Sequence, residues 1–196
     1  GKQDVDYVLT TTEIVRMIRK SGIVFDKVEI EAADVPFGIG SGSGVIFGVT
    51  GGVTEAVLRR LQQGHNRVDM ESIKKSGVRG DDGIKVLTYN YNGREIKAAV
   101  VNGLANADKV LQQIKNHEAE YDFVEVMACR RGCIMGGGQP VNAGPRTRKA
   151  RMKGLYDTDV NTQIKKSNEN PMILSLYDTL LKGKEHELLH RNFSGK

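Results

Sequence analysis

The chain's two cysteines, Cys129 and Cys133, are the residues best suited to chemistry, because a thiolate can serve as a soft metal ligand or a redox group. They stand at C-x3-C spacing, after a short apolar run (residues 123–128) and before three consecutive glycines (136–138). Structural zinc sites and redox dithiols more often use C-x2-C, and no second Cys or His pair completes four ligands. The pattern therefore predicts a site for a bulky metal group at the end of a buried strand, with half of the ligands absent from this chain.

A glycine-rich segment, residues 38–52, has some features of a phosphate-binding loop, because N–H groups at the start of a helix bind anions. It lacks the Lys-Ser/Thr of a P-loop, and its spacing does not follow G-x-G-x-x-G. A tight structural turn is favoured over nucleotide binding. A third interpretation is that the glycines let the backbone approach a large inorganic group.

The segment His186-Glu187-x-x-His190 matches the zinc-protease motif, in which two histidines bind zinc and the glutamate acts as general base. We expect a surface or packing role instead, because almost no sequence follows it to supply a third ligand or a cleft. The other histidines, His65 and His117, are isolated, and no Ser-His-Asp arrangement with a nucleophile elbow is present.

The composition is that of an ordinary globular protein, with 39% hydrophobic and 27% charged residues among 196. One or two domains are equally plausible at this length. The apolar stretches are too short for a membrane span, no signal peptide is apparent, and the low cysteine content favours a reducing cytoplasm. Gly1-Lys2 offers no start methionine, so we expect a fragment of a longer protein.

The net charge of +5 includes a cluster of basic residues in the last third of the chain. Its members are Arg146, Arg148, Lys149, Arg151 and Lys153, with Lys165 and Lys166 beyond. A solvated helix face is the favoured interpretation, and an acidic partner domain or an anionic cofactor would also account for the charge. No zinc finger, aromatic RNA-binding strand or helix-turn-helix pattern accompanies the cluster. We therefore expect no nucleic acid and no membrane among the partners.

Hydrophobic periodicity and turn residues predict alternating strands and helices, followed by a helical tail without strand signals. The clearest element is a hairpin with strands at 84–91 and 95–101, joined by Asn92-Gly93. In the core we also expect a strand at 5–10, a strand before Cys129, and helices that begin at Thr11-Thr12, Gly51-Gly52 and Asn106. In the tail we expect helices from Pro145, with breaks at Tyr156-Asp157 and Ser167, a new start at Pro171 and a last turn at 188–190. This pattern indicates an α/β core wrapped by an extension.

Residues 125–140, E-V-M-A-C-R-R-G-C-I-M-G-G-G-Q-P, closely resemble the third cysteine motif of iron-only (di-iron) hydrogenases, E-x-M-A-C-P-G-G-C-x-x-G-G-G-Q-P. Residues 4–11 are similar to the family's D-V-D-Y-V-L-T-T, and residues 41–56 to its S-G-A-G-x-I-F-G-x-T-G-G-V-M-E-A. The tail, from Arg148 through Asn170-Pro171 to His190, resembles the small-subunit region. The resemblance thus spans nearly the whole chain, with its motifs in family order.

The resemblance implies an active site in which a 4Fe-4S cluster is joined through one cysteine sulfur to a di-iron unit. Cys129 would bind the 4Fe-4S cluster alone, and Cys133 would bridge it to the di-iron subcluster. Met127 and Phe47 match residues that line the di-iron pocket. Three glycines would let the chain pass close to the cluster: Gly136, Gly137 and Gly138. The implied activity is the reversible conversion of protons and electrons to dihydrogen, with the metal carrying the chemistry.

The sequence departs from the family pattern in two ways. The upstream motifs T-S-C-C-P and M-P-C-x-x-K are absent, and with them the other two cluster ligands and the proton-relay cysteine. We therefore expect no catalytic residue within this chain, and no bound cluster or activity for the fragment alone. In addition, Arg130-Arg131 replaces Pro-Gly between the cysteines. Guanidiniums that point inward would raise the reduction potential of the cluster, and guanidiniums that point outward would alter partner docking.

The expected fold is accordingly the C-terminal lobe of the hydrogenase catalytic domain at 1–145, with a helical small-subunit-like extension at 146–196. Its class is α/β, a mainly parallel sheet flanked by helices with an antiparallel hairpin. The expected partners are an upstream lobe, a ferredoxin or similar electron carrier, and hydrogenase maturation proteins. A hydrogenase is the favoured function. The alternatives are a hydrogenase-like iron–sulfur protein that acts as assembly scaffold or sensor, and a dithiol redox module with a reversible Cys129–Cys133 disulfide.

Overall fold

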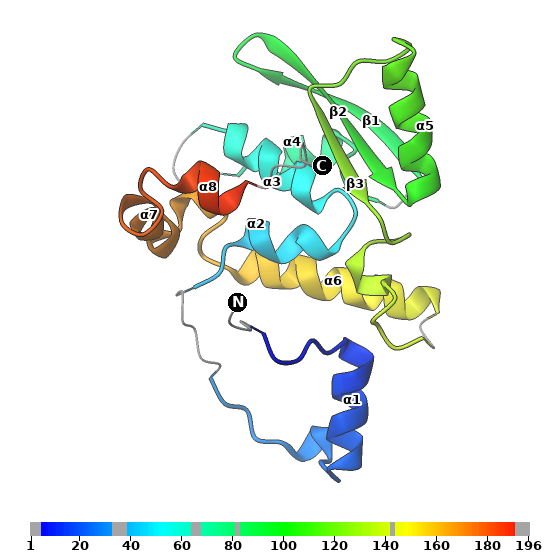
Figure 1. Cartoon of the computed structure of the whole chain (residues 1–196), viewed down its shortest axis with the longest axis vertical. Coiled ribbons are helices and arrows are strands. Elements are labelled where there is room, and N and C mark those ends of the chain that lie inside the picture. The colour runs from blue at the N-terminus through cyan, green and yellow to red at the C-terminus, as the bar shows by residue number, and fades with distance from the viewer. Residues whose placement is uncertain (1–4, 33–38, 64–67, 81–82, 142–143, 191–196) are drawn as a thin grey trace.

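The computed structural model describes residues 5–32, 39–63, 68–80, 83–141 and 144–190, which form a small sheet with helices on both faces and a helical tail packed alongside (Figure 1). The elements in chain order are α1 (Thr11–Lys20), η1 (Phe25–Lys27), α2 (Gly42–Val45), η2 (Ile46–Gly48), α3 (Gly52–Leu61), α4 (Met70–Lys75), β1 (Ile84–Tyr91), β2 (Arg94–Asn102), α5 (Leu104–Lys115), β3 (Phe123–Met127), η3 (Cys133–Met135), α6 (Pro145–Asn161), η4 (Ser167–Glu169), α7 (Pro171–Asp178) and α8 (Glu185–Leu189). None of the helices in these ranges is long and apolar enough to cross a bilayer.

The sheet has the order β1-β2-β3, with β1 and β2 antiparallel and β2 and β3 parallel. The second half of the central strand β2, residues 98–102, is buried on both faces, because successive side chains of a strand point to opposite sides. Ala98 and Val100 pack with residues of α3 and α4, whereas Ala99 and Val101 pack with residues of α5. The buried faces of these helices hold the carboxyl ends of β2 and β3 in a fixed position.

A third apolar cluster lies where η2, the cysteine loop (residues 128–138) and α6 meet. Its buried members are Ile46, Val49 and Ile134, and the partly buried side chains packed against them are Met135, Met152, Leu155 and Tyr156. The short helix α2, which leads into η2, lies alongside α6 in Figure 1. Segments that are about 100 residues apart in the sequence therefore share one core beneath the cysteines.

The α/β class, the hairpin, the strand before Cys129 and the helical C-terminal part are confirmed. Asn92 adopts a left-handed φ of 51°, as the tight hairpin turn requires. Pro171 opens α7 at its first turn, as predicted. α1 begins at the predicted place, but its N-cap is Thr10, which forms a reciprocal capping box with Glu13.

Three local predictions are wrong. Residues 5–10 form no strand with any strand of the described sheet, and the side chains of Tyr7 and Val8 are more than four-fifths exposed. Asn106 lies inside α5, whose N-cap is Gly103, and donates to the carbonyl of Asn102. The helix α6 continues through Tyr156-Asp157 to Asn161, because Tyr156 packs into the third cluster.

Candidate metal centre at the cysteine loop

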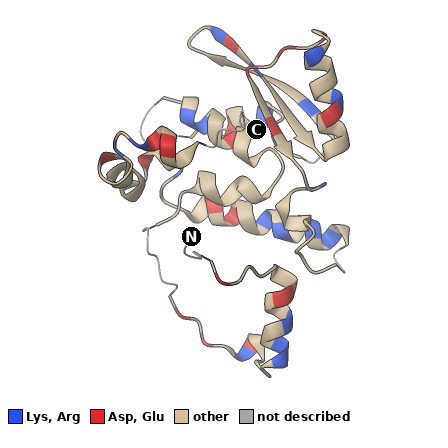
Figure 2. Cartoon of the chain, in the orientation of Figure 1, with Lys and Arg blue, Asp and Glu red and all other residues tan. Residues whose placement is uncertain are grey.

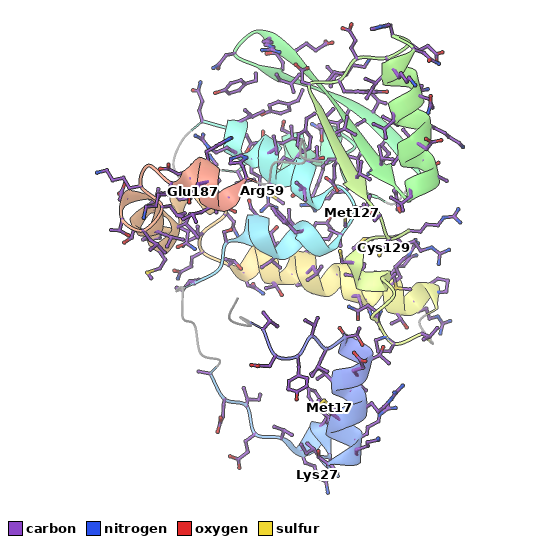
Figure 3. All side chains as sticks on the ribbon, in the orientation of Figure 1. Met17, Lys27, Arg59, Met127, Cys129 and Glu187 are labelled. Carbon is purple, nitrogen blue, oxygen red and sulfur yellow. The ribbon has the colours of Figure 1, made fainter. Side chains whose placement is uncertain are left out.

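The cysteine loop follows β3 directly and lies at the carboxyl end of the parallel strands β2 and β3, the usual place for ligand sites in α/β sheets (Figure 3). Cys129 and Cys133 are exposed, and both are free thiols. Between them, the N–H of Gly132 donates to the carbonyl of Cys129 at 3.1 Å, which closes a β-turn. Arg131, the third residue of this turn, has a left-handed φ of 74°.

Two glycines of the loop allow close approaches that a side chain would prevent. A Cβ on Gly132 would lie 2.9 Å from the carbonyl oxygen of Gly48, so no side chain fits there without a shift of backbone. A Cβ on Gly136 would lie 3.4 Å from the Sγ of Cys129. Gly132 therefore lets the loop pack against the turn at 48–50. Gly136 leaves the backbone without a side chain beside the Cys129 thiol.

The other two glycines of the run have different surroundings. A Cβ on Gly137 would meet no other atom within 4 Å, whereas one on Gly138 would lie 3.1 Å from the Cβ of Thr10. Thr12 donates both its N–H and its hydroxyl to the carbonyl of Gly138, each at 3.0 Å. Gly138 therefore has a packing reason of its own, which is to admit the start of α1 against the loop.

Asn102, the last residue of β2, is almost completely buried and connects the cysteine loop to the core. Its Oδ1 accepts the N–H of Arg131 at 2.9 Å, and its Nδ2 donates to the hydroxyl of Thr50 at 3.3 Å. The N–H of Gly103 in turn donates to the carbonyl of Met127 at 2.8 Å. The end of β2 therefore holds the middle of the loop as well as its first residues.

Glu125, in the middle of β3, is buried and connects this strand to the start of α3. Its carboxylate accepts the N–H of Gly51 at 2.8 Å and both the N–H and the hydroxyl of Thr54 at 2.7 Å. A carboxylate at a helix N-terminus satisfies N–H groups that have no partner within the helix. Glu125 thereby fixes the strand that carries the cysteines against the segment that begins at Gly51.

Met127 and Phe47, the two predicted pocket residues, lie in different surroundings. Met127 is buried at the end of β3, two residues before Cys129 (Figure 3). Phe47 is 45% exposed and lines an open hollow of about 400 Å³ with Val53 and Asn168, among others. The backbone of η2 thus contacts the cysteine loop, while the Phe47 ring lines a hollow on the side of α3 and the tail.

The basic residues of the tail gather on the N-terminal half of α6, which lies against the cysteine loop (Figure 2). Arg131 lines a small hollow of about 70 Å³ together with Met135 and Arg148 at the start of this helix. Arg151 donates to the carbonyl of Ile134 at 2.7 Å. Arg131 and the start of α6 therefore line the same hollow, and the surface beside the thiols is cationic, which favours an anionic group or an acidic partner.

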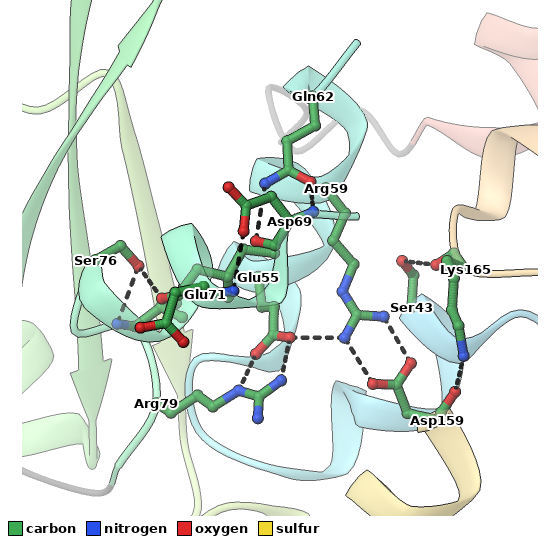
Figure 4. Close-up of polar contacts among 12 residues, drawn as sticks. Ser43, Glu55, Arg59, Gln62, Asp69, Glu71, Ser76, Arg79, Asp159 and Lys165 are labelled. Atoms are coloured by element: carbon green, nitrogen blue, oxygen red, sulfur yellow. Dashed lines mark hydrogen bonds and ion pairs between the residues drawn. The ribbon is translucent and has the colours of Figure 1, made fainter. Parts of the chain in front are cut away.

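A buried ionic network joins α3 to the tail (Figure 4). Arg59, with no exposed surface, donates to both carboxylate oxygens of Asp159 at 2.6 and 2.7 Å and to Glu55 at 2.6 Å. Arg79 donates two further bonds to Glu55, and its guanidinium lies 4.2 Å from the centre of the Tyr156 ring. Within the described part of the chain, the Nε of Arg59 is the buried side-chain atom left without a partner.

The surroundings of Arg59 and of Tyr156 raise the pKa of both groups. Burial opposes the charge on Arg59, but the hydrogen bonds and ion pairs with Asp159 and Glu55 outweigh it and raise the pKa of the guanidinium. Burial, reinforced by the charge of Glu55, raises the pKa of Tyr156 to about 12. Charged Arg59 and neutral Tyr156 are therefore the stable forms at neutral pH. The network is a fixed structural junction rather than a proton-transfer site.

The glycine-rich segment is a structural turn, as favoured from the sequence. The N–H groups of Gly42 and Ser43 at the start of α2 donate to the tail carbonyls of Ile164 and Lys165, so they do not face an anion. A Cβ on Gly42 would lie 2.0 Å from the Oδ1 of Asp159, which shows that this glycine admits the buried carboxylate. The glycine therefore serves contact between two parts of the chain.

The tail histidines are also arranged as a surface feature. His186 and His190 are exposed, and their rings stack with centroids 4.8 Å apart. Over the ranges that the structure describes, no group of three or more His, Cys, Asp or Glu side chains is placed to hold a metal ion. His65 lies outside the described residues.

Two family models together match most of the sequence and divide near the start of α6. The model described as "Iron only hydrogenase large subunit, C-terminal domain" matches residues 1–137, and "Iron hydrogenase small subunit" matches residues 145–196. The part with the sheet and the cysteine loop thus corresponds to the C-terminal domain of a hydrogenase large subunit. The basic helical tail corresponds to the small subunit. The chain belongs to the iron-only hydrogenase family.

Individual relatives agree with this membership. "Iron hydrogenase 1" of Clostridium pasteurianum is 38% identical over 97% of this chain and 35% of its own length. The "Periplasmic [Fe] hydrogenase large subunit" of Nitratidesulfovibrio vulgaris is 43% identical over 74% of this chain and 34% of its own length. A solved structure of a variant of the [FeFe]-hydrogenase HydA1 from Chlamydomonas reinhardtii has 34% identity and a TM-score of 0.69 over 96% of this chain and 55% of that one. The chain spans about a third of the length of the curated relatives it matches.

The residues of the loop fit half of the ligand set of a 4Fe-4S cluster. Two free thiols suit iron, and Gly136 places no side chain against the Sγ of Cys129. A four-thiolate cluster needs two further ligands, and this chain has no other cysteine. The donor chemistry therefore agrees with the family, and the ligand number requires a contribution from outside these residues.

The residues that hold the loop were not singled out from the sequence. Glu125 is an acidic residue in an otherwise apolar strand, and Asn102 ends the apolar run of β2. A buried polar residue in such a strand needs a hydrogen-bond partner, so each position signals a structural contact. The partners themselves, Thr50, Thr54 and the N–H of Arg131, follow only from the packing.

Proposed function

We propose that this chain is the C-terminal part of a catalytic domain that interconverts protons, electrons and dihydrogen. The observation that carries the proposal is the cysteine loop: two free thiols at the carboxyl end of a parallel strand pair, beside bare glycine backbone, in a chain of this family. When bound, the cluster supplies the iron site at which the hydrogen chemistry takes place.

The proposed roles of the chain's own residues are binding and exclusion of water. Cys129 would hold the 4Fe-4S cluster, and Cys133 would hold it together with the di-iron subcluster. The buried Met127 would form an apolar wall near the metal, and the Phe47 ring would reach the site only if it turned from the hollow it now lines. Gly136 keeps space open beside Cys129. No residue of the chain is proposed as the proton donor.

We propose that an upstream lobe of the same protein supplies the two missing ligands and covers the N-terminal segment. The segment exposes a series of large apolar side chains: Val5, Tyr7, Val8, Leu9, Ile14, Met17, Ile23, Val24, Phe25, Val28 and Ile30. So many exposed large apolar side chains within 26 residues favour a covering partner. Because Thr12 binds Gly138, a lobe on this surface would also lie next to the cysteine loop.

Further features of the proposal concern organisation and partners. The boundary at residues 145–146 is supported by the ends of the two family models and by the start of α6 at Pro145. The cationic loop and α6 would suit an acidic electron carrier such as a ferredoxin, and maturation proteins would deliver the di-iron unit.

A cytoplasmic location is proposed from the free thiols, and cell fractionation would test it against the periplasmic relative.

A second candidate is a cluster-assembly or sensor protein without turnover. Its support is a relative named "Cytosolic Fe-S cluster assembly factor narfl" from Xenopus tropicalis, which is 28% identical over 93% of this chain. The Arg130-Arg131 pair in place of Pro-Gly also favours a protein with altered cluster chemistry. Neither Arg130 nor Arg131 is buried, so both guanidiniums can contact a partner.

The test is infrared spectroscopy on the full-length protein that carries this chain, produced without oxygen together with hydrogenase maturation proteins. Carbon monoxide and cyanide stretching bands are expected, and a Cys133→Ser variant should lose them while a Ser175→Ala variant keeps them. Iron–sulfur absorption without those bands would overturn the hydrogenase proposal in favour of the assembly or sensor function. Absence of any iron–sulfur absorption would overturn both.

A further inference from the structure

The turn between the two cysteines adopts a conformation that its own sequence does not favour. In a turn closed by Gly132 N–H and Cys129 carbonyl, the left-handed third residue is normally glycine, and proline favours the second position in type II turns. This chain has Arg130 and Arg131 there, and Arg131 has a φ of 74°. A side chain in this region is sterically disfavoured, so contacts outside the turn must stabilise it.

The contact that the structure provides is the buried side chain of Asn102. Its Oδ1 accepts the N–H of Arg131 at 2.9 Å, which holds the peptide plane that precedes the left-handed residue. The other end of the amide is fixed by the hydroxyl of Thr50 at 3.3 Å, and the backbone N–H of Asn102 donates to Gly83 at 2.8 Å. Asn102 is only 1% exposed, so water does not compete for these bonds.

We propose that Asn102 is a positioning residue for the cysteine ligands, because it imposes the turn geometry that Arg130-Arg131 does not favour. The hydrogen bond acts on the centre of the C-x3-C segment, so the relative placement of the two thiols depends on it. The proposal rests on the proposed function of the loop as a cluster site. It adds that the site is held from the end of β2, by an uncharged side chain bonded to the backbone of the loop.

The experiment compares three changes. Asn102→Ala removes the bond to Arg131. Thr50→Val is the matched control, because it removes the hydroxyl that accepts from the other end of the Asn102 amide and leaves the Arg131 bond in place. The third is a rescue variant, in which Arg130→Pro and Arg131→Gly are combined with Asn102→Ala. Proline and glycine favour the turn by themselves, so they should restore the loop if its conformation is what Asn102 provides.

The first readout is amide hydrogen exchange of the 129–133 segment in this 196-residue chain without cluster. Asn102→Ala should accelerate exchange at Arg131 by about tenfold, the effect of one lost hydrogen bond, and Thr50→Val should change it much less. Exchange in the rescue variant should return toward the original rate at Gly132, whose N–H closes the turn. Unchanged exchange in a folded Asn102→Ala chain, or equal acceleration in Thr50→Val, would overturn the proposal.

The second readout is the iron–sulfur absorption and iron affinity of the full-length protein after treatment with iron and sulfide. Asn102→Ala should lower the affinity by about 10–100-fold, as for other residues that orient metal ligands, and the Pro-Gly pair should restore it. If Asn102→Ala does not fold and the Pro-Gly pair rescues neither folding nor iron, the residue has only a structural role and the proposal fails. If the unaltered protein binds no iron, the proposed function fails, while hydrogen exchange still decides the role of Asn102.

Discussion

The junction between core and tail differs sharply from the N-terminal segment, although each of them contains a helix. At the junction, α6 places Asp159 against Arg59 and Tyr156 in the third apolar cluster, and these ionic partners are buried (Figure 4). The N-terminal helix α1 has no buried residue and contacts the cysteine loop through Thr12. In Figure 1 it stands away from the sheet and the other helices.

The difference shows which interfaces are formed entirely within this chain and which surface is left uncovered. Buried charges are stable only when they are paired, so the junction must be closed in this chain for Arg59 to be tolerated. Exposed apolar side chains carry a smaller penalty, so α1 can stay uncovered until another surface meets it. The tail is thus part of the folding unit, and the N-terminal segment is proposed as an interface.

The largest expected effect is at the closed junction. Asp159→Ala would leave the charge of Arg59 buried with Glu55 as its remaining ionic partner, and should lower the free energy of unfolding by about 3–5 kcal/mol. Urea denaturation measures the loss. The matched control is Asp157→Ala on the same helix, which removes an exposed pair with Lys153 and should cost less than about 1 kcal/mol. Equal losses would mean that the junction is not the closed interface described above.

A second prediction extends the closed region to the cysteine strand. Glu125→Ala would remove the acceptor of three hydrogen bonds from Gly51 and Thr54 in a buried site, and should lower the free energy of unfolding by about 2–4 kcal/mol. Thermal unfolding followed by circular dichroism measures it. The exposed Glu95 in β2 is the control, and Glu95→Ala should change stability little. A similar small change at Glu125 would show that β3 is held by its strand pairing alone.

A third prediction uses pH to probe the junction. The pKa of Tyr156 is raised from 10.0 to about 12, so the fold favours the neutral phenol. Its contribution is fully present below the unfolded pKa and is lost as the pH rises from 10.0 to about 12. The free energy of unfolding should fall over this range by about 1–2 kcal/mol more than in Tyr156→Phe, which keeps the ring. Parallel curves for the two proteins would contradict a buried Tyr156.

The smallest expected effect is at the open surface. Phe25, which is 72% exposed, and Met17, which is 53% exposed, should tolerate substitution by serine with a change below about 0.5 kcal/mol in this chain. Leu58→Ala, at a buried position of α3, is the contrasting control and should cost about 2–4 kcal/mol. Chemical denaturation measures all three. A large loss at Phe25 would mean that the N-terminal segment is already packed in solution and would remove its role as an interface.

Much of the fold could be predicted because its signals are local. The alternation of β1 and the Asn92-Gly93 turn define the hairpin, and Pro171 after Asn170 begins α7. The absence of a strand at 5–10 could not be predicted, because a mostly apolar segment says nothing about whether a neighbouring strand is present. The continuity of α6 through Tyr156 depends on packing against residues more than 100 positions earlier in the chain.

The sequence predicted the cysteine ligands of the candidate site but not the residues that hold the loop in place. The types and spacing of Cys129, Cys133 and Gly136 identify the loop, because soft ligands and bare backbone are rare in combination. The hydrogen bonds that Asn102 and Glu125 accept cannot be read from the sequence, since each joins residues far apart along the chain.

The sequence by itself determined the family, the two thiols and the local elements, because motif spacing and turn chemistry are properties of neighbouring residues. The tertiary structure alone decided that the glycine-rich segment contacts the tail, that Arg131 lines a hollow with the start of α6, and that Asp159 pairs with Arg59. These outcomes depend on which buried polar groups find partners across the chain. That pairing is fixed only when distant segments are brought together in the folded core.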